Sequence, residues 1–107
     1  MGRILAIDYG RKRSGLAVTD TLQLIATGLT TVPSGELVKY LSDYVSKEPV
    51  DLFVVGLPKQ MNNELSENMI HIEAFVKHLK RIIPTTIFNS YITNSKYFIH
   101  YYLLLLI

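Results

Sequence analysis

Two short apolar runs near the start of the sequence, separated by only five residues, restrict the fold most strongly. The runs are residues 3–8 (RILAID) and 14–19 (SGLAVT), each as long as an ordinary β-strand. Strands joined by so short a connection pair in opposite directions, as a β-hairpin. The sequence therefore predicts an antiparallel hairpin whose turn, at residues 9–13, ends in three consecutive basic residues.

A third strand and a first helix are expected next. Residues 24–32 (LIATGLTTV) are rich in β-branched side chains, which favours a strand, and Gly28 is a candidate β-bulge. Ser34 is a residue type that caps helices, and the stretch after it, up to about Lys47, repeats apolar residues at helical spacing. Pro49 marks the end of this helix. Its apolar side chains are Leu37, Val38, Leu41, Tyr44 and Val45.

The following residues predict a buried strand and a second helix. Residues 50–56 (VDLFVVG) form a nearly continuous apolar run, which is typical of a central parallel strand covered on both faces. Steps of three and four between apolar residues then predict a helix over residues 65–83. The residues in these steps are Leu65, Met69, Ile72, Val76, Leu79 and Ile83. The order βββαβα predicts an α/β fold with a mixed sheet, completed by one more strand after residue 84.

The composition changes after residue 84. Of the 21 residues from Ile87 to Ile107, 17 are Ile, Phe, Asn, Tyr, Lys or Leu, whose codons consist mostly of A and T, and no acidic residue follows Glu73. The last apolar run is about half as long as a bilayer-spanning helix, so no membrane helix is expected. We interpret residues 1–84 as an incomplete folded domain and residues 85–107 as an aberrant segment, from a frameshift or truncation. The alternative is an unusual buried strand and helix.

Bulk properties limit the classes of protein. A chain of 107 residues has room for one domain, and the absence of cysteine excludes disulfides and thiolate metal sites and is compatible with the cytoplasm. Asp8 interrupts any apolar stretch that could serve as an export signal. The net charge of +2 is too small to indicate a nucleic-acid partner by itself. The basic residues are nevertheless concentrated near the start, at Arg3, Arg11, Lys12 and Arg13.

The strongest local signal is the pair Asp8 and Gly10 at the end of the first predicted strand. A carboxylate at that point reaches the space above the sheet where open α/β sheets bind ligands. Gly10 allows the backbone to approach a phosphate, and residues 11–13, with Gly15, can pair with phosphates from the lip of the hairpin. On this interpretation Asp8 binds a divalent metal ion that activates water against a phosphodiester. The alternative is an ordinary hairpin in which Asp8 caps the turn and the basic residues are solvated.

The loop after residues 50–56 is a second candidate element. If that strand runs parallel to the first, its carboxyl end opens beside Asp8, and the loop faces the same space. The loop begins with Gly56, Leu57, Pro58 and Lys59. Its side chains Lys59, Gln60, Asn62 and Asn63 suit contacts with a nucleic-acid backbone. The alternative is that Gly and Pro simply end a buried strand.

Other charged residues are weaker candidates. Asp20 is expected in a turn or at the opposite end of the sheet, as a cap. His71 and His78 lie about 10 Å apart along the predicted helix, too far to bind one ion, and are expected on a solvated face with Glu67. A basic stripe is conceivable near the end of that helix, although the helix dipole also favours cations there. The stripe would consist of Lys59, Lys77, Lys80 and Arg81.

Together these motifs resemble a known family. The segments that carry the resemblance are ILAIDYGRKRSGLAVTD, ATGLTTV, VVGLPKQMNNELSEN and IEAFVKHLK, in this order over about residues 2–84. They are similar to the YqgF (RuvX-like) family of bacterial RNase H-like proteins, described as Holliday junction resolvases and as nucleases that mature the 5′ end of pre-16S ribosomal RNA. The resemblance implies an RNase H-like fold, Mg²⁺ or Mn²⁺ as cofactor, and an rRNA precursor, branched DNA or the ribosome as partner.

The resemblance also assigns residues. Asp8 would be the catalytic residue and first metal carboxylate. Tyr9, Gly10, Arg13 and Gly15 would belong to the motif of the first strand, and Gly56, Leu57 and Pro58 to a second motif. Residues 11–13 and Lys59 remain the candidates for contact with nucleic acid.

The sequence departs from the family pattern after residue 84. The family continues with a D-E-R-[FY]-[TS] motif and a last helix, each of which supplies a further acid, whereas FNSYITNSKY stands here in place of that motif. Two-metal phosphodiester hydrolysis needs several carboxylates that converge on the ions. We therefore expect weak metal binding and an impaired nuclease.

Three alternatives to a metal-dependent endonuclease remain. A non-catalytic nucleic-acid- or ribosome-binding module would keep residues 11–13, and its binding would depend on salt without any cleavage. Sugar kinases and actin-like ATPases also begin with an Asp-x-Gly hairpin, but they need a second similar half, for which 107 residues leave no room. The chain could also be unstable, if the segment after residue 84 leaves apolar surface exposed.

Overall fold

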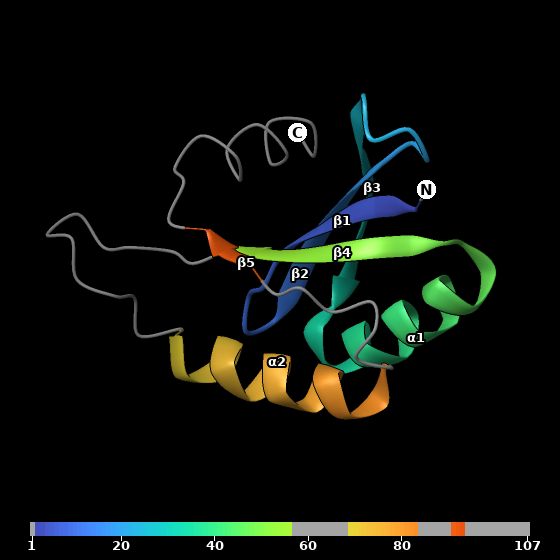
Figure 1. Ribbon diagram of the computed structural model, residues 1–107. Coiled ribbons are helices and arrows are strands. Elements are labelled where there is room, and N and C mark those ends of the chain that lie inside the picture. Colours follow the sequence, from blue (N-terminus) through green and yellow to red (C-terminus); the bar gives the residue numbers. More distant parts are fainter. Residues whose placement is uncertain (1, 57–68, 84–90, 94–107) are drawn as a thin grey trace, which may run out of the picture.

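The computed structural model describes residues 2–56, 69–83 and 91–93, which form a mixed sheet with two α-helices (Figure 1). The sheet has five strands in the order β3-β2-β1-β4-β5. The strands are β1 (Arg3–Asp8), β2 (Arg13–Thr19), β3 (Ala26–Pro33), β4 (Val50–Gly56) and β5 (Tyr91–Thr93). The helical elements are η1 (Ser34–Glu36), α1 (Leu37–Lys47) and α2 (Met69–Ile82). The predicted α/β fold with a mixed sheet and a fifth strand is confirmed.

β1 lies at the centre of the sheet and pairs differently on its two sides. It pairs antiparallel with β2, with Leu5 opposite Val18 and Asp8 opposite Gly15. It pairs parallel with β4, where Leu5 lies opposite Phe53, and β5 continues the parallel part beyond β4. The predicted hairpin and the predicted parallel strand are both confirmed.

The third strand begins later than residues 24–32 predicted, because the turn that precedes it extends to Ile25. Its pairing with β2 changes register at one point. Leu16 and Ala17 face Thr30 and Gly28, so one additional residue of β3 lies between the two pairs. The bulge predicted at Gly28 is therefore present beside it.

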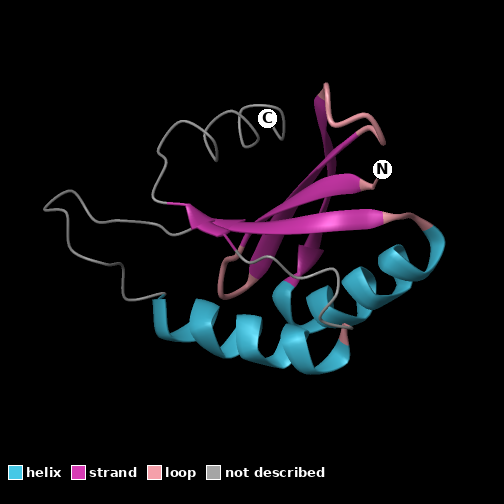
Figure 2. Cartoon of the chain, in the orientation of Figure 1, coloured by secondary structure: helices cyan, strands magenta, loops and turns pink. Residues whose placement is uncertain are grey.

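Both α-helices lie on the same side of the sheet (Figure 2). Alternate residues of β1 divide between the two faces: Leu5 and Ile7 join the core beneath the helices, and Ala6 joins a small alanine cluster on the other face. The helices contribute Leu37 and Leu41 of α1, and Ile72, Phe75, Val76 and Leu79 of α2, to the main core. The predicted apolar face of α1 is confirmed, and so are the positions Ile72, Val76, Leu79 and Ile83 of the second helical segment, to which the structure adds Phe75. Met69 is not part of this core, and Leu65 lies outside the described ranges.

Ser34 does not have the predicted capping role. It begins the short helix η1, α1 begins only at Leu37, and no side chain caps either element. The hydroxyl of Ser34 instead donates to the carbonyl oxygen of Gly10 in the hairpin turn. A capping serine accepts a backbone N–H through its oxygen. Here the Ser34 hydroxyl contacts the Ser14 hydroxyl and the carbonyl oxygen of Gly10 instead.

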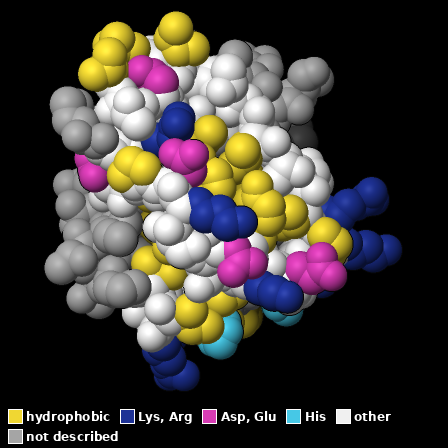
Figure 3. Space-filling view, turned by 90° about the vertical axis from the view of Figure 1, so that its right-hand side faces the viewer, with side chains coloured by type: hydrophobic (Ala, Val, Ile, Leu, Met, Phe, Trp, Pro, Cys, Tyr) yellow, Lys and Arg dark blue, Asp and Glu magenta, His cyan; other side chains and the backbone are white. Residues whose placement is uncertain are grey.

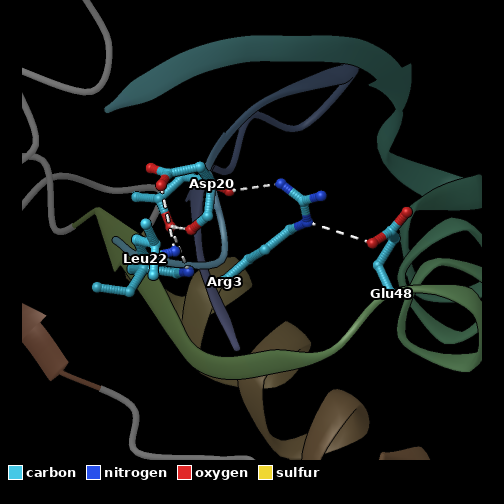
Figure 4. Close-up of polar contacts among 6 residues, drawn as sticks. Arg3, Asp20, Leu22 and Glu48 are labelled. Carbon is cyan, nitrogen blue, oxygen red and sulfur yellow. Dashed lines mark hydrogen bonds and ion pairs between the residues drawn. The ribbon is translucent and has the colours of Figure 1, made fainter. Parts of the chain in front are cut away.

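Asp20 lies in the turn after β2, at the end of the sheet remote from the Arg11–Arg13 turn, as expected. Its carboxylate accepts backbone N–H groups of Leu22 (3.1 Å), Leu24 (2.9 Å) and Ile25 (2.8 Å). These bonds lower the pKa of Asp20, since they favour the charged form. Figure 4 shows this turn beside Arg3. On its other side, the Nε group of Arg3 donates a hydrogen bond to the carboxylate of Glu48. The predicted capping role of Asp20 is correct.

The side of the molecule at the amino ends of β1 and β4 carries charges of both signs. Figure 3 shows basic and acidic side chains intermingled around exposed hydrophobic atoms on that side. One ion pair there joins Arg3 Nε and Glu48 Oε2 at 3.3 Å. Arg3, which the sequence groups with the basic residues near the start, is therefore partly neutralised and separate from residues 11–13.

Several predictions concern residues outside the described ranges. These are the loop at 57–64, the first predicted helical residues at 65–68, and the segment at 94–107. Within the ranges that are described, no helix is long and apolar enough to cross a membrane.

Candidate functional site

The carboxyl ends of the three parallel strands meet at one edge of the sheet. Ile7 of β1 lies opposite Val55 of β4, so Asp8 and Gly56 end the two strands at the same level. Gly56 in turn lies opposite Thr93 of β5. This edge is where open α/β sheets bind ligands, because side chains and loops from several strands converge there.

Asp8 is the acidic residue of this edge within the described ranges. Its side chain is exposed, while Ala6 and Ile7 immediately before it are buried. The protein around the carboxyl group nevertheless displaces part of its water and raises the pKa of Asp8 above the ordinary value. A carboxyl group held where its charge is disfavoured is a frequent mark of a functional site.

Because its pKa is raised, Asp8 should lower stability at neutral pH. The folded chain binds the Asp8 proton more tightly than the unfolded chain, so stability falls as the pH rises from below 3.8 through the folded pKa, and then stays level. Asp8→Asn should therefore melt at a higher temperature than the parent at pH 7, with the difference vanishing in acid. Thermal melts followed by circular dichroism between pH 3 and pH 7 measure this.

Asp20→Asn is the control of opposite sign. Its carboxylate is stabilised by folding, so this variant should be less stable than the parent at neutral pH, and the loss should fade as the pH falls through the lowered pKa of Asp20. If Asp8→Asn also melts lower at pH 7, the carboxyl group of Asp8 is not disfavoured by the fold.

The turn after Asp8 is held by backbone contacts that require Gly10. A Cβ atom at Gly10 would lie 2.4 Å from the carbonyl oxygen of Arg13, closer than real side chains approach. The N–H of Ser34 donates to the carbonyl oxygen of Lys12 at 2.9 Å, which ties the turn to the end of β3. Glycine is thus needed here so that the turn can close, a reason additional to the predicted approach of a phosphate.

The side chains of residues 11–13 point away from this fixed backbone. All three are exposed, and none makes an ion pair with another described residue. Three cations in sequence with no ion pair to a described residue favour a positive potential at the edge that Asp8 occupies.

Tyr9 connects the turn to α2. Its ring stacks on Phe75, with centroids 4.9 Å apart and planes inclined by 21°. Such a stacked pair contributes about 0.5–1.5 kcal/mol beyond the area it buries. α2 therefore supports the residue between Asp8 and Gly10. Phe75, Ser14 and Ser34 belong to this site, and sequence reasoning assigned none of them to it.

The other predicted site residues either lie outside the described ranges or are placed as predicted. Leu57, Pro58 and Lys59, with the rest of their loop, lie outside the described ranges. His71 and His78 are exposed on α2, as expected. Lys77, Lys80 and Arg81 are also exposed, which agrees with a basic stripe. Among the described residues no three His, Cys, Asp or Glu side chains form a group that could hold a metal ion.

Comparison with known proteins agrees with this geometry. Residues 2–94 match the family model described as "RuvX: Holliday junction resolvase". The chain is 76% identical over 85 residues to a protein of Parabacteroides distasonis named "Putative pre-16S rRNA nuclease", covering 79% of this chain and 61% of that protein. Relatives with the same name in Bacteroides thetaiotaomicron and Porphyromonas gingivalis are 66% and 60% identical, over 84 and 85 residues.

The alignments to these relatives are limited in two ways. They cover 78–79% of this chain, and the chain covers about three fifths of the length of these relatives, 61–62%. The family match, over residues 2–94, includes both the Asp8 turn and β5. The chain belongs to the RuvX family.

Proposed function

We propose that the chain carries the amino-terminal part of the site of a metal-dependent endonuclease that acts on structured nucleic acid. The observation that supports this most directly is the position of Asp8. An exposed carboxyl group with a raised pKa ends the central strand, beside a turn that presents three cations with no ion pair to any described residue. A carboxylate next to phosphate-binding cations is the arrangement that a phosphodiesterase uses to hold a metal ion against its substrate.

The favoured substrate is the 5′ region of precursor 16S ribosomal RNA. The relatives at 60–76% identity are named as nucleases of pre-16S rRNA, whereas the family model is named for Holliday junctions. Both substrates present closely spaced phosphates, which the exposed side chains of residues 11–13 can contact without reading sequence. On this proposal the turn binds the backbone, and Asp8 marks the position of cleavage.

The donors present fit a complete metal centre poorly. Mg²⁺ keeps several waters and is bound through one or two carboxylates together with the phosphates of its substrate, and two-metal sites need more. Asp8 is one carboxylate, the described residues hold no group of three possible metal ligands, and the sequence has no acid after Glu73. We therefore propose that these 107 residues alone bind Mg²⁺ or Mn²⁺ weakly and cleave slowly or not at all.

A second candidate function is a non-catalytic module that binds nucleic acid or the ribosome. It is favoured by the contrast between the two halves of the site. The basic turn is intact and held by backbone hydrogen bonds, whereas the carboxylate set is reduced to Asp8 among the described residues. Such a module would bind RNA in a salt-dependent manner without hydrolysis.

A binding and cleavage assay tests these proposals together. The purified chain is titrated with an end-labelled precursor 16S rRNA fragment and with a four-way DNA junction, each with Mg²⁺. We expect salt-sensitive binding of the RNA and at most slow cleavage, which Asp8→Asn abolishes. Absence of salt-sensitive RNA binding would contradict the RNA assignment, and tighter binding of the junction would reassign the substrate to DNA. Rapid cleavage that depends on Asp8 would contradict the proposed impairment.

A further inference from the structure

Two hydroxyl groups and the backbone N–H and C=O of one residue, Gly10, form a closed ring of hydrogen bonds beneath the basic turn. The backbone N–H of Gly10 donates to Ser14 Oγ at 3.4 Å, and the hydroxyl oxygens of Ser14 and Ser34 are 2.7 Å apart. The hydroxyl of Ser34 donates to the carbonyl oxygen of Gly10. The ring therefore begins and ends on the backbone of Gly10.

The direction of every proton in this ring follows from chemistry. A carbonyl oxygen can only accept, so the single proton of Ser34 is directed to Gly10. The contact between the hydroxyls then requires Ser14 to donate to Ser34, and Ser14 is left to accept the N–H of Gly10. Each hydroxyl both donates and accepts, so removing either one breaks two bonds and opens the ring.

The ring also lies in a protected place. Ser14 has 0% relative exposure and is one of two buried polar side chains among the described residues. It lies in β2, whereas Ser34 begins η1 directly after β3, so the ring joins a strand and a short helix to the turn. A buried polar group that loses its partners is costly, which makes this arrangement rigid as long as both hydroxyls are present.

We propose that Ser14 and Ser34 are positioning residues for the nucleic-acid site. They fix the Gly10 peptide, and through it the orientation of Asp8 relative to residues 11–13. This inference rests on the proposed function, since it assigns the ring a purpose in binding phosphates. Neither side chain needs to touch the nucleic acid, because they act through the backbone that carries the residues that do.

The first test compares Ser34→Ala with Ser34→Thr in RNA binding. Ser34 is only partly buried, so threonine can keep the hydroxyl. We expect Ser34→Ala to bind the precursor rRNA fragment about five- to eightfold more weakly at 0.1 M salt, the equivalent of one lost phosphate contact. Its salt dependence should be correspondingly shallower, and Ser34→Thr should restore both values.

Ser46→Ala is the matched control. The Ser46 hydroxyl donates to the carbonyl oxygen of Asp43 at 2.6 Å on exposed α1, so this variant also loses one hydroxyl-to-backbone bond. Binding is measured well below the melting temperature of each variant, so that lower stability alone leaves the affinity of the folded chain unchanged.

A double variant tests whether the two hydroxyls act as one unit. Ser14→Ala combined with Ser34→Ala should weaken binding no more than either single change, because the same ring is lost in each case.

A measurement without RNA keeps the inference separate from the proposed function. Backbone ¹⁵N order parameters of residues 10–13 should fall in Ser34→Ala and remain at parent values in Ser46→Ala. Order parameters that stay at parent values in Ser34→Ala overturn the positioning role, whether or not the parent binds RNA.

The binding data separate the two proposals. The positioning inference is wrong if the turn loosens in Ser34→Ala but its RNA affinity stays at the parent value. The proposed function still stands in that case if substitution of residues 11–13 weakens RNA binding. If the parent does not bind RNA, the functional half of the inference fails with the proposed function.

Discussion

Replacing Arg11, Lys12 and Arg13 together with glutamine should weaken binding of precursor rRNA about 100- to 500-fold at 0.1 M salt. Each cation that neutralises a phosphate releases counter-ions and contributes roughly 0.7 to 0.9 to the slope of log affinity against log salt, so three lost contacts lower the slope by about 2 to 3. The three side chains are exposed and make no ion pair with other described residues, so the fold should keep its stability. Fluorescence anisotropy of labelled RNA across a salt series measures both quantities.

A second charge variant distinguishes this turn from the overall positive charge. Lys39 and Lys47 are exposed on α1, and changing both to glutamine also lowers the net charge. We expect the salt slope of that variant to remain close to the parent value. The loss in the slope of log affinity against log salt is divided by the number of cations removed in each variant. Equal values for the two variants would mean that RNA is attracted to the net charge and not to the turn.

The strand pairings could be predicted because their local patterns allow few alternatives. A connection of only four residues between β1 and β2 leaves only a hairpin. The run at 50–56 is apolar at successive positions because both faces of β4 are covered. Phe53 and Val55 join the core beneath the helices, and Val54, which points to the opposite face, is also only 1% exposed.

Ser34 shows what local patterns cannot predict. A serine before a helix fits the capping pattern whether or not its oxygen accepts a backbone N–H of that helix. In the folded chain it donates to a carbonyl group 24 residues earlier, and this partner is within reach only once β3 has paired with β2. Phe75 is similar: its burial follows from helical spacing, but its stacking on Tyr9 depends on how the turn meets α2.

The candidate site was predictable to the extent that it lies within one motif. Asp8, Gly10 and residues 11–13 are contiguous, so their proximity needs only the hairpin. The residues that support them come from β2, η1 and α2. Because these residues lie in other elements, no local sequence pattern predicts their contacts with the turn. The assignment of Asp8 to a metal and of Lys59 to nucleic acid stays a prediction.

Substituting Phe53 with alanine should have the largest effect on stability, a loss of about 3–5 kcal/mol in the free energy of unfolding. The side chain is 0% exposed, in the strand that pairs with β1, and its ring fills the core between the sheet and the helices. Alanine would leave a cavity there, in a domain of a size that is usually stable by only about 5–15 kcal/mol. Urea unfolding followed by circular dichroism measures the loss.

The matched control is Ile70→Ala, because Ile70 lies on α2, the helix that covers this core, but is 75% exposed. It should change stability by less than about 0.5 kcal/mol. Similar losses in the two variants would mean that β4 does not pack beneath α2 as described. Such a result would also affect the site, because the alignment of Ile7 with Val55 is what brings Asp8 level with the end of β4. A chain that tolerated alanine at Phe53 would have no fixed edge at which a carboxylate and three cations could act together.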